Sequence, residues 1–447
     1  MRQYFGTDGV RGVANAELSP ELAFAIGLAL GEDLGRKGSR PEVLIGQDGR
    51  LSGDLLEAAV GAGLMATGAD VLELGVLPTP AVAWATKAHG ASAGVMISAS
   101  HNPVEDNGIK IFGPDGFKLS DREEERLEAA IRGPGAPRPL GPGVGRRRAA
   151  GALRQAYVRH LGELGCPLTR RQVVVDCAWG AAAPVARQVL AATGAQVTLL
   201  HGRPDGRRIN VRCGSTDLSS LARAVRARGQ GSIGIAFDGD ADRALAVDEH
   251  GEAVSGDHLI GMFAPWFRRH GWLKRDGVAL TVLANGALRA MLAERGVRVA
   301  ETAVGDRYLL ESLRQTGYRL AGEPSGHLLA LDFSTTGDGL LTAVLLLWLL
   351  GETGQSLAEA KACFEPYPHL EAARPVGDKA RLAKDPRLLS AQEAEQARLG
   401  PSGRVSIRPS GTEPLIRVMV EGPDLAICAA IRDNLMALIG RLDREGG

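Results

Sequence analysis

Three stretches of the chain share one pattern of apolar and polar positions: a helix ending in small residues and glycine, followed by a β-branched strand. They are residues 63–72, 189–198 and 291–300, and strand-like apolar runs precede them at 42–46, 172–177 and 278–283. Gly68, Gly194 and Gly296 stand where a helix C-terminus favours a left-handed residue. Strand, helix and strand in this order form a βαβ unit. The pattern therefore predicts three homologous α/β domains with mixed sheets.

The last part of the chain has a different pattern. From residue 365 onward no long βαβ unit occurs, but strands are expected around 405–407 and 416–420, and a closing helix over 424–441. This predicts a smaller C-terminal α+β domain. A Pro/Gly-rich segment at 133–145 marks the first boundary. The predicted domains are residues 1–150, 151–250, 251–364 and 365–447.

Composition narrows the possible environments and partners. The chain has 447 residues and a formal net charge of zero, so no overall field favours nucleic acid or an anionic membrane. Its five cysteines show no C-x-x-C spacing, which argues against a disulfide framework or a structural zinc site and fits a reducing cytoplasm. The N-terminus has no evident secretory signal. The longest apolar run, 340–350, is too short to span a membrane and predicts a buried helix.

Polar residues gather directly after one strand of each predicted α/β domain. These loops are 100–103 (Ser-His-Asn-Pro), 238–243 (Asp-Gly-Asp-Ala-Asp-Arg) and 322–327 (Gly-Glu-Pro-Ser-Gly-His). Open α/β sheets bind ligands at the carboxyl ends of their strands. We therefore expect the three loops to converge on one cleft.

The loop 238–243 has the composition of a metal site. Asp238, Asp240 and Asp242 follow a buried strand at 234–237, and three crowded carboxylates are costly unless a divalent cation neutralises them. Ligands that are all oxygen indicate Mg²⁺ or a similar hard cation. An EF-hand is the weaker alternative, because Arg243 occupies its invariant glycine position. A solvated acidic turn stays open as a further alternative.

The remaining polar segments could supply a nucleophile, a phosphate site and sugar contacts, and two of them could instead be ordinary turns. Ser100, at the end of a buried strand, suits a nucleophile, although a polar turn is the alternative. The segment 408–417 offers two arginines around a Ser-Gly-Thr turn, which suits phosphate binding, or is an ordinary turn between strands. Glu323 and Ser325 could bind sugar hydroxyls. Residues 6–12 are too rich in glycine for a strand interior, and Arg11 there could reach an anion.

Together these motifs resemble the α-D-phosphohexomutase superfamily over essentially the whole chain. The resemblance rests on residues 5–12, 97–103, 238–243, 322–327 and 408–422, and residues 209–216 and 302–308 favour the glucosamine branch. It implies four domains around a central cleft, and interconversion of glucosamine 6-phosphate and glucosamine 1-phosphate, for amino-sugar nucleotide and cell-wall precursor synthesis. Pro324, Ala241, Trp179 and Asp217 depart from the usual pattern, and Pro324 puts substrate preference in doubt.

The resemblance also assigns roles to residues. Ser100 would carry a phosphoryl group, which the reaction requires, and one Mg²⁺ would be bound by Asp238, Asp240, Asp242 and a phosphate oxygen on Ser100. Glu323 and Ser325 would contact the sugar of the phosphosugar substrate. The distal phosphate would be held by Arg408, Ser410, Gly411, Thr412 and Arg417.

The expected mechanism passes through a sugar bisphosphate that reorients in the cleft. Phosphoryl transfer demands charge neutralisation, for which His101, Arg11 and Arg243 are candidates beside the cation. Lys110 and His327 are candidates for moving the hydroxyl proton. Specificity for glucose or mannose phosphate, a serine-dependent phosphatase and a non-catalytic sugar-phosphate sensor are the alternatives. Neither nucleic acid nor membrane is expected as a partner, and assembly as a homo-oligomer stays open.

Overall fold

The computed structural model describes the chain except residues 1–3, 7, 37–39, 134, 165–169, 230, 401–402, 411–412 and 446–447. It divides into two compact units. The first comprises Met1–Leu283 with Ala300–Lys361, and the second comprises Ala284–Val299 with Ala362–Gly447. Each unit is described by itself.

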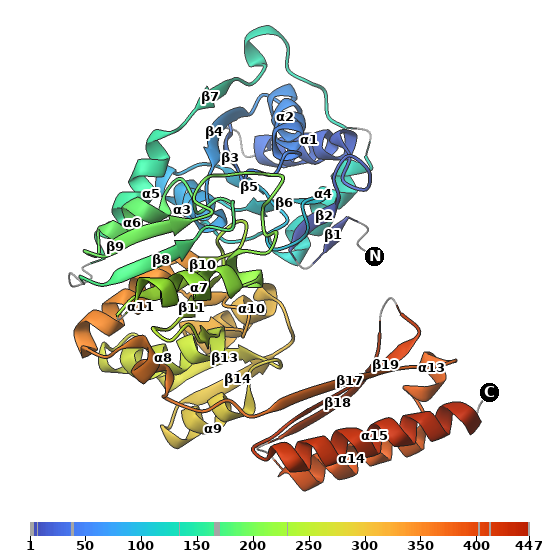
Figure 1. Cartoon of the computed structure of the whole chain (residues 1–447). Helices are drawn as coiled ribbons and strands as arrows, with labels where there is room; N and C mark the ends of the chain where they lie inside the picture. The colour runs from blue at the N-terminus through green and yellow to red at the C-terminus, as the bar shows by residue number, and fades with distance from the viewer. Residues whose placement is uncertain are drawn as a thin grey trace. The chain divides into compact units, whose positions relative to one another are not determined.

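The N-terminal part of the first unit is built on a seven-stranded mixed sheet, drawn in blue in Figure 1. Strands β5, β3, β4 and β7 run parallel to one another, while β1 pairs antiparallel with β2, β2 with β6, and β6 with β5. In sheet order the strands are β1 (Phe5–Gly6), β2 (Gly9–Val13), β6 (Asp106–Phe112), β5 (Ala93–Ile97), β3 (Glu42–Gln47), β4 (Asp70–Val76) and β7 (Arg147–Ala149).

Helices pack on this sheet because its central strands carry buried apolar side chains. Val43 and Ile45 of β3 join one buried cluster with apolar residues of α1, α2 and α4. Figure 1 shows α1 and α2 side by side over the sheet. Helix α3 contacts β3 and β5 as well as α5. The helices are α1 (Pro20–Gly35), α2 (Gly53–Ala66), α3 (Thr79–His89) and α4 (Asp121–Ile131), with a 3₁₀ turn η1 (Gly141–Gly143).

A five-stranded sheet forms the next part of this unit. Strands β8, β9 and β10 are parallel, while β11 and β12 continue the sheet antiparallel. In sheet order the strands are β12 (Ala253–Val254), β11 (Ala244–Val247), β10 (Ile233–Phe237), β8 (Gln172–Asp176) and β9 (Gln196–Leu200). The helices are α5 (Ala152–Gly162), α6 (Ala186–Ala191), η2 (Gly214–Thr216) and α7 (Ser219–Arg228).

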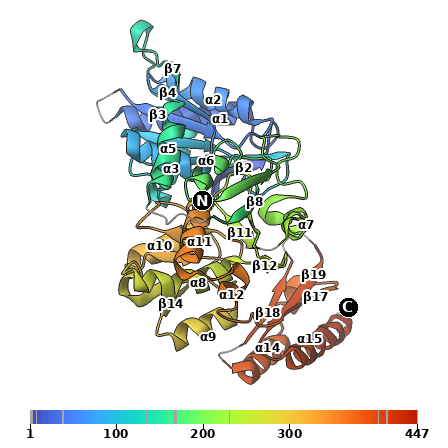
Figure 2. The same cartoon turned by 60° about the vertical axis from the view of Figure 1, so that its left-hand side comes forward.

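A four-stranded sheet follows, with β13 and β15 parallel and β15 and β16 antiparallel. In sheet order the strands are β14 (Arg298–Thr302), β13 (Gly277–Thr281), β15 (Leu320–Gly322) and β16 (Leu328–Ala330). The helices are α8 (Gly256–Arg269), η3 (Lys274–Asp276), α10 (Asp306–Thr316), α11 (Gly339–Thr353) and α12 (Leu357–Lys361). Figure 2 shows α8, α10 and α11 gathered around this part.

The second unit contains a three-stranded antiparallel sheet in the order β17, β19, β18. Val418 and Val420 pack with Ile431 and Leu435 of the last helix in one core. The elements are α9 (Gly286–Glu294), β17 (His369–Pro375), α13 (Lys379–Leu382), α14 (Pro386–Leu399), β18 (Arg404–Pro409), β19 (Leu415–Glu421) and α15 (Leu425–Glu445).

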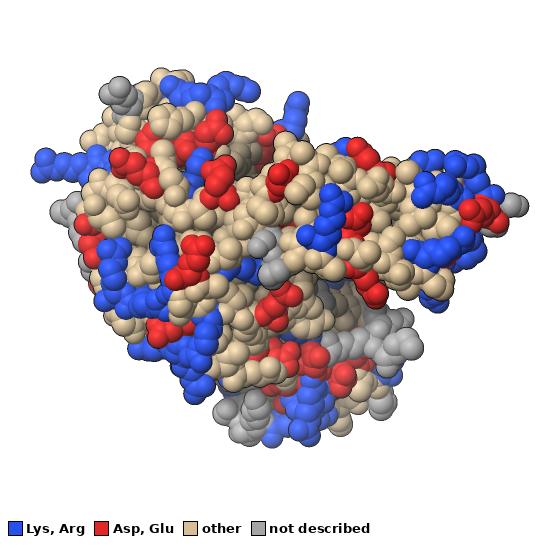
Figure 3. Space-filling view, turned by 90° about the horizontal axis from the view of Figure 1, so that it is seen from below, with Lys and Arg blue, Asp and Glu red and all other residues tan. Residues whose placement is uncertain are grey.

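These elements confirm the predicted fold class of three α/β parts and a smaller α+β part. Gly68, Gly194 and Gly296 all have positive φ, and the apolar run 340–350 lies within the buried helix α11. None of the helices in the described part of the chain is long and apolar enough to cross a membrane. Acidic and basic side chains are mixed over most of the face drawn in Figure 3, as the zero net charge suggests.

The prediction that residues 6–12 avoid strand structure is wrong. Gly9–Val13 is β2, which pairs with both β1 and β6. A side chain on Gly9 would collide with the carbonyl oxygen of Ile109 on β6, and one on Gly12 would meet Glu17. The glycines therefore permit a close approach of backbones instead of breaking the strand.

The start of α11 provides a test of how stability depends on pH. The carboxylate of Asp338 caps the helix by accepting from the Leu341 amide at 2.9 Å, and also accepts from the Tyr157 hydroxyl at 2.8 Å. Burial raises the pKa of Asp338 to about 6, although both hydrogen bonds oppose the rise. The folded state therefore retains this proton to higher pH than the unfolded chain does.

Because the folded pKa is raised, this contribution to stability is complete below the unfolded pKa of 3.8 and is lost as pH rises through about 6. The free energy of unfolding falls by about 3 kcal/mol over this range, at about 1.36 kcal/mol per pKa unit. Asp338→Asn keeps a capping oxygen but cannot ionise. Thermal unfolding should therefore show the variant gaining stability relative to the parent between about pH 4 and about pH 7. Parallel pH profiles would contradict this expectation.

Candidate active site

Ser100 lies just beyond the carboxyl end of β5, where the strand turns sharply. Its φ of 54° is left-handed, an uncommon conformation for a residue with a side chain. The Ser100 amide donates to Ser98 Oγ at 2.8 Å. The Ser100 hydroxyl donates to Asp238 Oδ2 at 2.6 Å, and its oxygen lies 3.4 Å from His101 Nδ1. Two loops predicted to meet are therefore in direct contact.

A buried arginine that the sequence interpretation missed supports this loop. The Arg50 guanidinium donates to the carbonyl oxygens of Ser100 at 2.9 Å and Asn102 at 2.8 Å, and also to those of Pro103 and Asp106. Asp48 Oδ2 accepts from Arg50 Nε at 2.9 Å, and both side chains are fully buried. The unusual backbone of the serine loop is thus fixed by one charged pair.

Asn210 supports the same loop from the second sheet's side of the unit. The side-chain nitrogen Nδ2 of Asn210 donates to the carbonyl oxygen of Ser100 at 2.8 Å and more weakly to that of Asn102 at 3.4 Å. Asn210 belongs to the segment 209–216 that carried the resemblance. The sequence did not indicate this role.

The three aspartates of the loop after β10 form a group that can hold a metal ion. One oxygen of each of Asp238, Asp240 and Asp242 lies within 4.8 Å of the others, and all three side chains are buried. Burial and the neighbouring Asp242 and Asp240 raise the pKa of Asp238. One oxygen of Asp240 and one of Asp242 have no hydrogen-bond partner in the described part of the chain. Such unpartnered anionic oxygens fit a hard divalent cation.

Lys110 extends from β6 into this acidic group. Its ammonium donates to Asp240 Oδ2 at 2.8 Å and lies 3.2 Å from Asp8 Oδ2 and 3.5 Å from Asp242 Oδ2. Burial alone would lower the pKa of Lys110, but these carboxylates raise it above its ordinary value. Lys110 is therefore a cation in this state, suited to neutralising negative charge.

Asp8 is a second residue that the sequence interpretation missed. Its carboxylate forms ion pairs with Arg11, Lys118 and Lys110. Burial would raise the pKa of Asp8, but Lys110, Lys118 and Arg11 hold it well below its usual range. Asp8 thereby holds Arg11 and Lys110 close to each other beside the acidic group.

His327, Arg243 and His101 also face the acidic group. His327 is buried with Nδ1 3.7 Å from Asp242 Oδ1, and its Nε2 has no hydrogen-bond partner in the described part of the chain. Burial would lower the pKa of His327, but Asp242 raises it. Arg243 Nε lies 3.8 Å from Asp242 Oδ1. Burial, Arg243 and Arg11 lower the pKa of His101, which favours its neutral imidazole.

The loop after β15 holds Glu323 and Ser325 next to each other. The Ser325 hydroxyl donates to Glu323 Oε1 at 2.7 Å, so the loop offers a carboxylate and a hydroxyl side by side. Pro324 is accommodated because its carbonyl oxygen accepts from the Gly256 amide at 3.0 Å, a contact that needs no amide on Pro324. The departure at Pro324 therefore leaves the fold of this loop intact.

The predicted distal-phosphate residues lie in the second unit. Arg408 of β18 and Arg417 of β19 are direct cross-strand partners, and Ser410 follows Arg408 at the turn. Gly411 and Thr412 lie outside the described residues. Lys379, which the sequence interpretation missed, donates to the carbonyl oxygens of Ser410 at 2.6 Å and Glu413 at 3.0 Å. This lysine ties both ends of the turn to α13.

A serine oxygen beside a buried acidic triad that could hold a metal ion, with a carboxylate and a hydroxyl side by side on the loop after β15, matches the site expected of a phosphohexomutase. Four profiles of phosphoglucomutase/phosphomannomutase match the chain in order: alpha/beta/alpha domain I at residues 2–136, domain II at 155–251, domain III at 255–367 and the C-terminal domain at 371–438. The chain belongs to the phosphoglucomutase/phosphomannomutase family.

Within that family the chain is similar to phosphoglucosamine mutases. It is 49% identical to the enzyme of Moorella thermoacetica, with 95% of this chain and 96% of that one covered. It is 46% identical to the enzyme of Desulforudis audaxviator, with 100% and 99% covered.

Solved structures agree on the fold. A phosphoglucomutase/phosphomannomutase family protein from Burkholderia thailandensis has a TM-score of 0.79 at 25% identity, with 98% of this chain and 97% of that one covered. An N-acetylphosphoglucosamine mutase from Aspergillus fumigatus, in complex with GlcNAc-6P and magnesium, has a TM-score of 0.66 at 18% identity, with 100% and 96% covered.

Proposed function

We propose that this protein interconverts glucosamine 6-phosphate and glucosamine 1-phosphate through a phosphoserine at Ser100 and a bisphosphate intermediate. The names and near-complete coverage of the phosphoglucosamine mutases support the substrate. The observation that carries the chemistry is the 2.6 Å hydrogen bond from the Ser100 hydroxyl to Asp238 in the acidic triad. The product feeds amino-sugar nucleotide and cell-wall precursor synthesis.

A phosphorylated Ser100 makes a cation at the triad necessary. Phosphorylation removes the hydroxyl hydrogen that Asp238 accepts and adds about two negative charges beside three carboxylates. Asp238, Asp240 and Asp242, with a phosphate oxygen, are the ligands we assign to one Mg²⁺. The ion supplies charge neutralisation for the transferring group. The phosphate on Ser100 therefore requires the cation for charge neutralisation, and the cation requires the phosphate oxygen as a ligand.

Each half-reaction exchanges one phosphorus–oxygen bond for another. In the first, the bond from phosphorus to Ser100 Oγ breaks, a bond to the sugar hydroxyl forms, and the hydroxyl proton leaves. After the bisphosphate has reoriented, its other phosphoryl group returns to Ser100 Oγ. We assign Arg11, His101 and Arg243 to charge neutralisation of the transferring group, and Lys110 and His327 to moving the hydroxyl proton; their contacts around Ser100, Asp8 and the aspartate triad support this.

Other residues bind the parts of the substrate that do not react. We assign Glu323 and Ser325 to the sugar, because their adjacent carboxylate and hydroxyl match neighbouring sugar hydroxyls. Arg408, Ser410, Gly411, Thr412 and Arg417 bind the phosphate that is not transferred, since paired guanidinium groups suit phosphate. The four segments 1–150, 151–250, 251–364 and 365–447 act as the functional domains of a cytoplasmic enzyme.

A coupled assay tests this function. The enzyme should convert glucosamine 6-phosphate with a higher kcat/KM than glucose 6-phosphate or mannose 6-phosphate. A preference for glucose or mannose phosphate would assign the protein to the other branch of the family, in line with the departure at Pro324. Release of inorganic phosphate instead of an isomer would overturn the mutase proposal.

Replacing Asp240 with asparagine tests the metal site. Asp240→Asn removes one anionic ligand without changing size, so we expect metal affinity to fall about 10- to 100-fold. Titration of Mg²⁺ against turnover should show a higher half-saturating concentration. Asp433→Asn, at an exposed position of the second unit, is the matched control. Unchanged activity and metal dependence in Asp240→Asn would place the cation elsewhere.

A further inference from the structure

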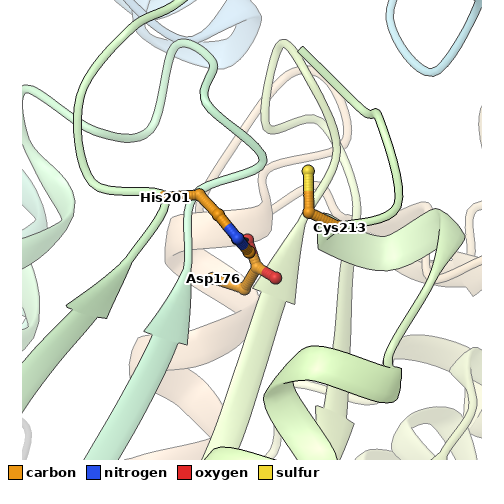
Figure 4. A group of neighbouring side chains, drawn as sticks. All are labelled: Asp176, His201 and Cys213. Atoms are coloured by element: carbon orange, nitrogen blue, oxygen red, sulfur yellow. Dashed lines mark hydrogen bonds and ion pairs between the residues drawn. The ribbon is translucent and has the colours of Figure 1, made fainter. Parts of the chain in front are cut away.

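A second cluster of metal-ligating side chains lies at the carboxyl end of the second sheet, outside the residues assigned above. Asp176 ends β8, His201 follows β9, and Cys213 precedes η2. Figure 4 shows the three side chains gathered from these loops. One ligand atom of each lies within 4.8 Å of those of the other two. Asp176 and Cys213 are buried, and His201 is 22% exposed.

We propose that Asp176, His201 and Cys213 form a second metal site, specific for Zn²⁺ or a similar borderline-soft divalent cation. Thiolate, imidazole and carboxylate are the ligands of zinc in proteins, and three of them leave a fourth position for water. The all-oxygen triad of Asp238, Asp240 and Asp242 suits a hard cation instead. The two clusters therefore differ in which cation they select.

The carboxylate of Asp176 is already oriented for such a role. Its Oδ1 accepts from the Ala178 amide at 2.9 Å, and its Oδ2 accepts from the Gly214 amide at 3.0 Å. Ligating carboxylates are commonly fixed by hydrogen bonds of this kind. The remaining contact of Oδ1 is with His201 Nδ1 at 2.8 Å, and it is this contact that the cation would replace.

The other two ligands are also available. Cys213 Sγ lies 4.0 Å from the carbonyl oxygen of Arg208, and its other polar neighbour is the backbone amide of Asn210. The His201 ring packs against Trp179, with ring centroids 5.0 Å apart, which limits its rotation. On binding, the thiol proton of Cys213 is released to solvent, and the imidazole keeps its single proton on the nitrogen that does not bind.

Occupancy of this site would act on the structure around Ser100. Cys213 and Gly214 end the segment that carries Asn210, and Asn210 donates to the Ser100 carbonyl oxygen. A cation joining β8, β9 and this segment would therefore stabilise the second sheet and fix Asn210. It would not take part in phosphoryl transfer.

Cobalt(II) as a probe tests the ligand set independently of catalysis. Protein saturated with Mg²⁺ and then titrated with Co²⁺ should develop sulfur-to-cobalt charge-transfer absorption in the near ultraviolet, saturating at one Co²⁺ per chain. Cys213→Ser should lose this band, and Cys428→Ser, a buried cysteine of the second unit, should keep it. Absence of the band in the parent, or its persistence in Cys213→Ser, would overturn the proposal.

Two measurements keep the test independent of folding defects in a variant. X-ray absorption of the zinc-loaded parent should show one sulfur ligand at about 2.3 Å together with nitrogen and oxygen ligands. Zn²⁺ added to the Mg²⁺-saturated parent should raise the thermal midpoint by a few degrees, and His201→Gln should abolish the rise. A zinc coordination shell of nitrogen and oxygen alone, or an unchanged thermal midpoint in the parent, would overturn the proposal. The cluster would then be a set of hydrogen-bonded side chains without a metal.

Discussion

Replacing Ser100 with alanine is expected to abolish isomerisation, lowering kcat by at least about 10³-fold, because the proposed phosphoryl carrier is lost. The Ser100 hydroxyl is nearly fully buried and donates to Asp238 at 2.6 Å. Alanine removes both the attacking oxygen and the atom that carries the phosphoryl group. Turnover is measured by coupled assay, and phosphorylation by intact mass and peptide mapping of the purified protein.

Two observations separate loss of the nucleophile from loss of fold. Ser100→Ala should retain the parent's thermal midpoint within about 2 °C, because a small polar side chain is replaced by a smaller one. Ser120→Ala, at the exposed N-cap of α4, should keep full turnover and the phosphate at Ser100. A phosphate mapped to another residue, or turnover surviving in Ser100→Ala, would show that Ser100 is not the carrier.

The sequence predicted the elements whose signals are local. The run before Ser100 is apolar, and it forms the buried strand β5. The run before Asp238 likewise forms the buried strand β10. Both polar loops therefore follow buried strands, as expected. Their meeting was expected because ligands of α/β sheets bind at the carboxyl ends of strands, and it joins strands of two different sheets.

Features that depend on distant packing were not predicted. Arg50 follows β3 just as Ser100 follows β5, but only the folded chain shows its guanidinium enclosed by the carbonyl oxygens of a loop fifty residues away. The strand β17 contains glutamate, arginine and proline, and alternate residues are exposed, so its pairing with β19 gives it the strand form. In both cases the partner, and not the local pattern, determines the structure.

The cluster of Asp176, His201 and Cys213 shows the same limit for metal sites. The expectation against a structural zinc site relied on the absence of C-x-x-C spacing, which detects only ligands close in the sequence. Here the three side chains come from the last residue of β8, the loop after β9 and the residue before η2. Sequence spacing therefore does not test a cluster of this kind.

Arg50→Met is expected to destabilise the first unit by about 3–5 kcal/mol, the cost of breaking a buried ion pair from one side. The change leaves the Asp48 carboxylate buried without its guanidinium partner. Burial already raises the pKa of Asp48 and Arg50 opposes that rise, so the unpaired carboxyl should bind a proton more readily. Thermal or denaturant unfolding with a probe in the first unit measures the loss.

The same variant should lose turnover beyond its loss of stability. Without Arg50 the carbonyl oxygens of Ser100 and Asn102 lose a charged donor, and the left-handed backbone at Ser100 is less well fixed. Misplacement of a reacting atom by about 1 Å lowers rates by about 10²-fold, so kcat should fall while KM changes little.

The double variant Asp48→Asn with Arg50→Met separates the two effects. Neutralising Asp48 removes the unpaired charge, so the double variant should recover part of the stability lost in Arg50→Met. It should not recover kcat, because the carbonyl oxygens of the serine loop still lack the guanidinium. Recovery of kcat together with stability would mean that Arg50 acts only through the charge of Asp48, and the positioning role would be wrong.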